Sequence, residues 1–148
     1  MTNENISKLK LLSKDIKDLQ VFSAYLQDSV IVTNDIKFLP KTKKLICVFN
    51  RFMWEDAEKG IFRKNKRIRS ALVFDNVLKV KSKGINPKKK SKILEFLAIK
   101  TEIIDNYFDI RLIFSGDSVL LVKAEEIDSS LEDFGKIWET SYKPKHKI

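Results

Sequence analysis

The stretch from residue 45 to residue 55, LICVFNRFMWE, is the most apolar part of the chain. It opens with five apolar residues in a row, after which Phe52 and Trp54 alternate with Arg51 and Met53. A short, aromatic-rich run that is apolar on both faces predicts an interior strand covered on both sides. We therefore expect this strand to lie at the centre of the molecule.

Helical spacing marks the part of the chain that precedes it. The residues that fall mostly on one side of a 3.6-residue period are Ile16, Leu19, Phe22, Ala24 and Leu26. Asp15 is a good N-cap, and Asp18 resembles the acid of a capping box. This pattern predicts an amphipathic helix that ends near Asp28, with a short strand before it at residues 9–12. A helix with one apolar stripe is expected to cover a sheet.

Elsewhere apolar and polar residues alternate with a period of two, which predicts strands. Residues 29–40 predict a hairpin or meander with a turn at Asn34-Asp35. Residues 68–83 alternate on both sides of Asp75-Asn76, which fits either one long strand bent there or a tight hairpin. Further strands are predicted at 93–104, 108–114 and 118–127, with turns at 105–107 and 115–117.

A second, short helix is predicted over residues 129–138, capped by Asp128 or Ser129. Its inward residues would be Leu131 and Phe134. Together these elements predict an α+β fold: a strongly curved, mostly antiparallel sheet of about seven strands, forming a partly open barrel. A pleckstrin-homology-like arrangement is one specific form of such a fold, although a fold-level likeness implies no function.

The length of 148 residues suits one domain. We expect it over residues 8–140, with flexible tails at 1–7 and 141–148. No apolar run approaches the roughly 20 residues of a membrane span, and the N-terminus has no apolar export signal. A single cysteine, Cys47, cannot form an internal disulfide, and this favours a cytoplasmic location.

Positive charge is concentrated in one part of the chain. The net charge is +9, and residues 37–92 hold 18 of the 29 Lys and Arg but only 4 of the 20 Asp and Glu. One explanation is a surface for an anion, such as nucleic acid, anionic lipid or an acidic protein. The other explanation is codon bias. Lys far outnumbers Arg in this chain, whereas phosphate recognition that needs a planar group favours Arg.

Cations cluster at both ends of the predicted 68–83 strand, so we expect two separate basic regions rather than one groove. The candidate binding residues of the first cluster are Arg63, Lys64, Arg67 and Arg69.

Residues that could supply catalytic or metal-binding chemistry are few. The only histidine is His146, Cys47 lies in the most apolar strand as an expected core residue, and the four glycines are scattered. We therefore expect no metal and no cofactor.

Polar residues in the central strand are the best candidates for a site, because Asn50 and Arg51 are costly to bury unless they are paired. One interpretation is a polar pocket with Arg51 as an anion anchor and Trp54 as a wall. The other places Arg51 outward, Asn50 against a neighbouring turn and Trp54 in the core. Glu55 beside Arg51 could form an acid–base pair, although a solvated ion pair is the simpler explanation.

Several segments share a family pattern: Leu26-Gln27-Asp28 with Val30, Asn50-Arg51-Phe52 with Trp54-Glu55, the residues Phe74, Val77, Leu78, Val80, Ser82, Gly84 and Ile85, and the closing Ile127, Leu131, Asp133 and Gly135. With these residues the sequence resembles a small, uncharacterised bacterial family, a domain of unknown function. The resemblance runs from about Leu9 to Trp138 and implies no activity, substrate or cofactor.

The sequence favours a non-catalytic binding or interaction domain that acts on a protein partner. The reason is that the chain has enough apolar residues for a well-formed core but no recognisable set of catalytic residues. The alternative is a nucleic-acid-binding protein that uses residues 37–92, with Phe52 and Phe62 as stacking aromatics. A third hypothesis is an enzyme with a site at Arg51 and Glu55.

Overall fold

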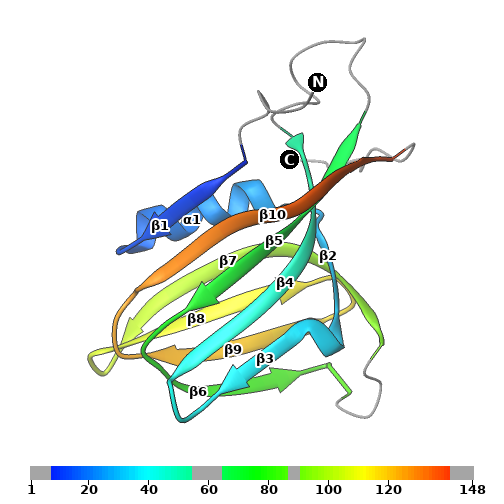
Figure 1. Ribbon diagram of the computed structural model, residues 1–148. Coiled ribbons are helices and arrows are strands. Elements are labelled where there is room, and N and C mark those ends of the chain that lie inside the picture. The colour runs from blue at the N-terminus through cyan, green and yellow to red at the C-terminus, as the bar shows by residue number, and fades with distance from the viewer. Residues whose placement is uncertain (1–7, 55–64, 87–90, 141–148) are drawn as a thin grey trace.

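The computed structural model describes residues 8–54, 65–86 and 91–140. In these ranges one α-helix, α1 (Ile16–Leu26), accompanies ten strands, and a short 3-10 turn, η2 (Thr33–Asp35), lies between two of them (Figure 1). The strands are β1 (Lys10–Ser13), β2 (Val30–Val32), β3 (Ile36–Leu39), β4 (Lys44–Phe52), β5 (Lys66–Phe74), β6 (Val77–Lys83), β7 (Ile93–Ile104), β8 (Tyr107–Phe114), β9 (Ser118–Ala124) and β10 (Ser129–Glu139). They pair in the order β1-β10-β5-β4-β2-β7-β8-β9-β6, and β3 also pairs with β4.

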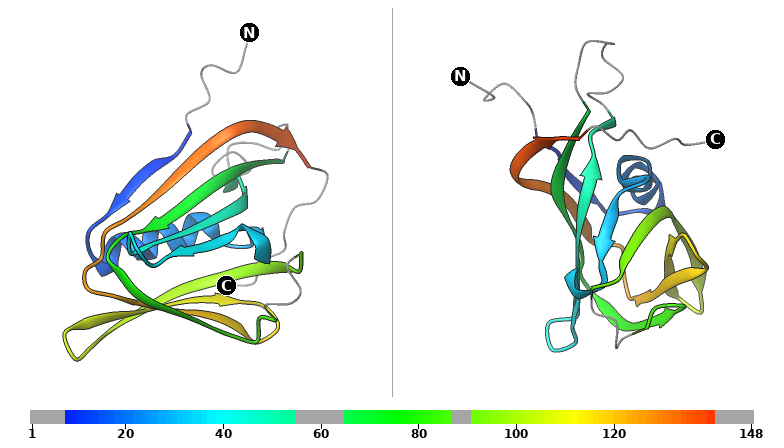
Figure 2. Two further views of the ribbon diagram at one scale, coloured as in Figure 1. Left: turned by 60° about the horizontal axis from the view of Figure 1, so that its bottom comes forward. Right: turned by 90° about the vertical axis from the view of Figure 1, so that its right-hand side faces the viewer.

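The strands lie in two layers with the core between them (Figure 2). The front layer consists of β1, β10, β5, β4 and β3, and the back layer consists of β7, β8, β9 and β6. Strand β2 joins the layers, because it pairs with both β4 and β7. The ring of Phe49 on β4 lies 5.6 Å from that of Phe96 on β7 and 6.5 Å from that of Phe114 on β8. These three aromatic rings mark the centre of the core.

The predicted N-terminal helix is present, with the predicted cap. The Asp15 carboxylate accepts the N–H of Asp18 at 2.8 Å, and the Asp18 carboxylate accepts the N–H of Lys14 at 3.1 Å. These bonds satisfy N–H groups that have no partner within the helix. The helix buries one face in the core, through Leu19, Phe22 and Leu26. No helix in the described ranges has the length and apolar character needed to cross a membrane.

The sheet is neither closed nor strongly curled, so the predicted partly open barrel and its pleckstrin-homology-like form are wrong. The antiparallel pairing is as expected, but there are ten strands where about seven were predicted. The count differs for physical reasons. The turn η2 separates β2 from β3, the chain bends at Asp75-Asn76 between β5 and β6, and the last segment is a strand.

The bend at Asp75-Asn76 carries the chain from one layer to the other. Strand β5 pairs with β4 and β10, whereas β6 pairs with β9, so the alternative of a tight hairpin is excluded. Asn76 has a φ of +59°, which Asn tolerates better than most residues. Residues 29–40 form no hairpin either, because β2 and β3 each pair with β4 rather than with each other.

The predicted C-terminal helix is wrong, because its residues form β10. Ser129, Leu131 and Asp133 are buried and alternate with more exposed residues, which is the period of a strand. Strand β10 lies between β1 and β5, and pairing on both sides outweighs local helical preference. Phe134, expected to face inward, is 40% exposed. Gly135 lies where the register with β5 shifts, and so belongs to a bulge.

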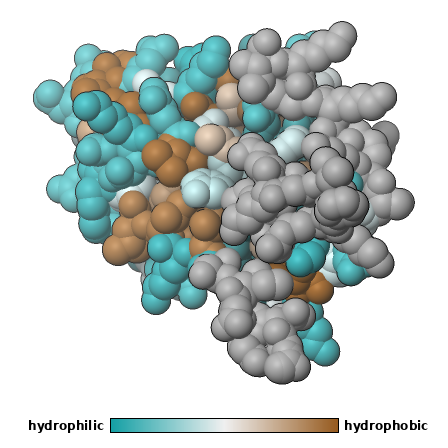
Figure 3. All heavy atoms as spheres, turned by 90° about the horizontal axis from the view of Figure 1, so that it is seen from above, coloured by the Kyte–Doolittle hydropathy of each residue, from teal (hydrophilic) through white to brown (hydrophobic). Residues whose placement is uncertain are grey.

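Strand β4 is central, as predicted, but it is covered on one side. Leu45, Cys47 and Phe49 are buried in the core, whereas Ile46 and Val48 on the opposite face are half-buried. No described helix or layer lies over that outer face in Figure 2. Within the described ranges, the expectation that β4 is covered on both sides is therefore wrong. Figure 3, a view from above, also shows that hydrophobic side chains reach the surface in patches at that end of the molecule.

Candidate functional site

The guanidinium of Arg51, predicted as an anion anchor, holds an anion of the protein itself. Arg51 is fully buried, its Nε donates to Asp133 Oδ1 at 3.1 Å, and its Nη2 donates to Oδ2 at 2.7 Å. The two residues meet because β4 and β10 lie on either side of β5. A two-point pair of this kind compensates both charges where water cannot. The interpretation with an outward Arg51 is therefore wrong.

Neighbouring groups complete the surroundings of this pair. The Asp133 carboxylate also accepts the N–H of Leu9 at 2.9 Å and the hydroxyl of Ser70, and the Tyr25 ring lies 5.7 Å from the Arg51 guanidinium carbon. Both charged side chains are 0% exposed. A dissolved ligand therefore has no access to either charge, and the pair joins strands of the front layer.

Three other candidates, Asn50, Trp54 and Arg67, lie at one end of β4 and β5 and make contacts within the chain. Trp54 Nε1 donates to the carbonyl of Gln27 at 2.9 Å. Arg67 Nη1 donates to the carbonyl of Asn50 at 3.1 Å, and its guanidinium covers the ring of Phe52 at 5.6 Å. The structure thus brings these residues close to one another.

Arg69 lies directly opposite Asn50 in the register of β4 and β5, but its side chain contacts a different pair of residues. Its Nη2 is 3.5 Å from the Asp35 carboxylate, and its guanidinium carbon is 5.9 Å from the ring centre of Phe134. The remaining candidates, Glu55, Arg63 and Lys64, lie outside the described residues. The binding role of the first basic cluster and the enzyme hypothesis that needs Glu55 therefore stay predictions.

Nucleophilic and metal chemistry find little support in the described residues. Cys47 is fully buried, and desolvation raises the pKa of its thiol to about 12. The thiol therefore remains protonated at neutral pH. Because only the thiolate is an effective nucleophile, Cys47 is not activated for nucleophilic chemistry. In ranges 8–54, 65–86 and 91–140, no group of three or more His, Cys, Asp or Glu is placed to hold a metal ion.

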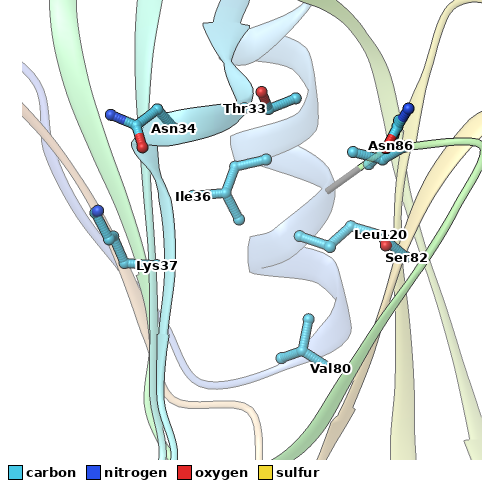
Figure 4. A pocket seen from close by; sticks show the side chains of 9 residues that line it. Thr33, Asn34, Ile36, Lys37, Val80, Ser82, Asn86 and Leu120 are labelled. Atoms are coloured by element: carbon cyan, nitrogen blue, oxygen red, sulfur yellow. The ribbon is translucent and has the colours of Figure 1, made fainter. Parts of the chain in front are cut away.

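A cleft of about 420 Å³ opens between β3 and β6 (Figure 4). One wall comes from η2 and β3, and the other comes from β6, the segment after it and β9. The lining residues are Thr33, Asn34, Ile36, Lys37, Val80, Ser82, Ile85, Asn86 and Leu120. The volume falls in the range of roughly 300–1,000 Å³ that is common for binding pockets.

The cleft has an aliphatic floor and a polar rim. Ile36, Val80 and Ile85 are half-buried and pack against the core, and in Figure 4 Ile36 and Leu120 point from opposite walls toward the middle. Hydroxyl and amide groups line the rim, and Lys37 is the only charged residue among the nine that line the cleft. None of the described residues in the lining carries a carboxylate, imidazole or thiol. This arrangement suits binding better than acid–base chemistry.

Both walls are edges of the sheet. Among the described strands, β3 pairs only with β4, and β6 pairs only with β9. An edge strand can present backbone N–H and C=O groups to another chain. The cleft therefore combines an apolar floor with two potential pairing edges.

The exposed lysines of β6 and the arginines of β5 lie in different layers of the molecule. Lys79, Lys81 and Lys83 are exposed on β6, in the back layer, whereas Arg67 and Arg69 lie on β5, in the front layer. Within the described part of the chain, the three lysines form no ion pair. In the part of the chain that the structure describes, the cations of residues 66–83 are thus divided between two layers, as expected.

A family model with the description "Protein of unknown function (DUF2948)" matches residues 9–146. The chain belongs to this family. The predicted resemblance to a domain of unknown function is thereby confirmed. The DUF2948 match spans all the described strands, both walls of the cleft and the Arg51–Asp133 pair. No curated protein and no solved structure matches the chain.

The cleft of this DUF2948 protein could not be found by sequence reasoning. Its walls come from residues 33–37, 80–86 and 120, which carry no shared motif. The local signal was the alternation of apolar residues with lysine in β3 and β6. Which strands become edges depends on pairing between distant segments, so the alternation alone could not place the cleft.

Proposed function

We propose that this domain is a non-catalytic binding module that takes up an extended segment of a protein partner in the cleft between β3 and β6. The observation that carries the proposal is the position of the cleft, between two edge strands and over an aliphatic floor. Extended peptides bind sheet edges through main-chain hydrogen bonds, while alternate side chains fill pockets. The cleft offers both kinds of contact.

The chemistry of the lining supports binding without catalysis. Side chains of an added strand that point inward would contact Ile36, Val80 and Leu120. Burial of apolar surface contributes about 25 cal/mol per Å², and main-chain pairing adds affinity that depends little on the sequence of the partner. The groups that move protons in most active sites are absent from the nine lining residues.

The test uses a fluorescent, neutral peptide of about eight residues in which Thr and Val alternate, a length typical of strands. Val80→Arg places a long charged side chain in the cleft and should weaken binding at least tenfold, measured by fluorescence anisotropy. Val119→Arg is the matched control, because Val119 is half-buried on β9 but lies outside the cleft lining. Its affinity for the peptide should equal that of the unchanged protein.

A second variant guards against misfolding of the first. Ser82 lines the cleft and is exposed, so Ser82→Arg should block the cleft with little effect on the core. Circular dichroism and thermal melting establish that each variant is folded. The proposal is contradicted if both cleft variants bind the peptide as well as Val119→Arg does, or if neither this peptide nor its alternating Glu-Val and Lys-Val counterparts bind the unchanged protein.

A further inference from the structure

Strand β6 alternates between two environments. Val80 and Ser82 line the cleft, whereas Lys79, Lys81 and Lys83 are exposed, with Lys79 and Lys81 bordering the outer face of the back layer. Successive side chains of a strand point to opposite faces, so the lysines lie on the side away from the aliphatic floor. The edge of β6 therefore separates an apolar surface from a row of cations.

Strand β3, the other wall, shows the same alternation. Ile36 and Phe38 pack against the core, and Lys37 between them is exposed. Lys37 pairs in register with Ile46, whose side chain belongs to the outer face of the front layer. On both strands that border the cleft, apolar residues that face the core thus alternate with exposed lysines, and on β3 that lysine, Lys37, also belongs to the cleft lining.

We infer that the partner segment is an acidic strand in which carboxylate side chains alternate with apolar ones. The inference rests on the proposed function, because it concerns the strand that enters the same cleft. A strand beside β6 would place every second residue over the aliphatic floor and the others beside Lys79, Lys81 and Lys83. Opposite charges on neighbouring strands stabilise pairing, and like charges oppose it.

The charges around β6 favour an anionic partner. Lys79 and Lys81 border a shallow groove of about 300 Å³ together with Lys123. Among the described residues that line the groove, the one carboxylate is that of Asp109, which accepts two hydrogen bonds from Arg111 at 3.3 Å. Three lysines therefore face a single carboxylate that already has a cationic partner, which leaves the groove positive.

The composition of this face favours carboxylates over nucleic acid. Single-stranded nucleic acids bind where aromatic side chains offer stacking platforms beside basic residues. Tyr107 borders this region of the back layer. Lys123 Nζ lies 4.4 Å from the centre of its ring, so a cation–π contact already covers one face of that ring. Lysine is also a point charge without the planar fork that favours phosphate. A carboxylate on a neighbouring strand needs only a nearby ammonium group.

Exposed lysines have another well-known use, which makes a different prediction. They protect sheet edges from pairing with other chains. If protection were their whole role, a neutral strand would bind as well as an acidic one, and replacing the lysines by acids would not weaken binding of an acidic strand selectively.

The test compares three alternating peptides of about eight residues: Glu-Val, Thr-Val and Lys-Val. Each is titrated against the unchanged protein at about 50 mM and about 200 mM salt, since screening grows over this range. We expect the Glu-Val peptide to bind about tenfold more tightly than the Thr-Val peptide at the lower salt concentration, and the Lys-Val peptide to bind most weakly. The advantage of the Glu-Val peptide should shrink at the higher concentration.

A pair of triple variants separates local pairing from overall charge. Lys79→Glu, Lys81→Glu and Lys83→Glu together should remove the preference for the Glu-Val peptide. The matched control changes Lys17, Lys100 and Lys136 to Glu, which alters the net charge equally at exposed positions on α1, β7 and β10. That control should keep most of the preference, with binding of the Thr-Val peptide unchanged in both variants.

The outcomes distinguish this inference from the proposed function. Equal binding of the Glu-Val and Thr-Val peptides would overturn the inference and leave the proposed function standing. Failure of all three peptides to bind would overturn the proposed function itself. Binding of a labelled oligothymidylate that the β6 variant abolishes, without binding of the Glu-Val peptide, would identify a nucleic-acid surface and also overturn the inference.

Discussion

Arg51 on β4 and Asp133 on β10 form a two-point ion pair inside the protein, although 82 positions separate them in the sequence. Both side chains are 0% exposed, and the pair spans β5, which lies between their strands. The arrangement explains why an arginine occurs within the most apolar strand of the chain. Its charge is compensated by a carboxylate that the last strand of the fold supplies.

The first prediction concerns this pair. Asp133→Asn keeps the shape of the side chain but leaves the Arg51 charge buried without its counterion. The free energy of unfolding should fall by roughly 3–5 kcal/mol, the usual cost of breaking a buried pair. Urea denaturation measures the change.

Two further variants sharpen this prediction. Asp109→Asn is the control, because Asp109 pairs with Arg111 near the surface and its loss should cost about 1 kcal/mol or less. The double variant Arg51→Met, Asp133→Leu removes both charges and should recover most of the lost stability. If Asp133→Asn costs no more than Asp109→Asn, the pair does not have the structural role described above.

The second prediction concerns the aromatic centre of the core. Phe49 contacts the rings of Phe96 and Phe114 across the two layers. Phe49→Ala should lower the free energy of unfolding by roughly 3–5 kcal/mol, because it removes buried apolar surface and leaves a cavity. Phe134→Ala, at a side chain that is 40% exposed, should cost much less. Similar melting temperatures for the two variants would show that the layers are not joined through Phe49.

The third prediction links Cys47 to the pH dependence of stability. Burial raises the pKa of its thiol from 9.0 to about 12. A group with a higher pKa in the folded state stabilises that state fully below its unfolded pKa. That contribution is then lost between pH 9.0 and about pH 12, at up to about 1.4 kcal/mol per pH unit. The unfolded chain ionises first, so alkaline conditions favour unfolding.

Comparison with Cys47→Ala isolates this contribution from all other titrating groups. The difference in free energy of unfolding between the unchanged protein and the variant should be constant up to about pH 9 and then decrease. Urea denaturation at several pH values between about 7 and 10.5 measures it. A difference that stays constant over the whole range would mean that the thiol ionises as easily in the folded protein as in the unfolded one.

Local chemistry accounts for the features that the sequence predicted correctly. The Asp15 cap depends on a side chain and N–H groups within one helical turn. The β8–β9 turn is similarly local, because Gly116 and Asp117 have φ angles of +73° and +59°, conformations that Gly and Asp accept. Such elements need no knowledge of distant segments, and the predicted bend at Asp75-Asn76 belongs with them.

Features that depend on distant segments were predicted poorly. The spacing of Leu131 and Phe134 suggested a helix, but pairing with β1 and β5 on both sides makes β10 a strand. Arg51 was recognised as a residue that must be paired, yet no local signal pointed to Asp133. The cleft was missed for the same reason, since its walls come from strands that are not neighbours in the sequence.

Amide hydrogen exchange, measured with and without the Glu-Val peptide, tests the central claim most directly. Main-chain pairing with a bound strand slows the exchange of the amides that it protects. Strand β1 is a matched control, because among the described strands it pairs only with β10 and lies at the opposite end of the sheet from β6. We predict slower exchange in residues 36–39 and 77–83, with no change in residues 10–13. Unchanged exchange in both walls of the cleft, or equal slowing in β1, would contradict the proposed mode of binding.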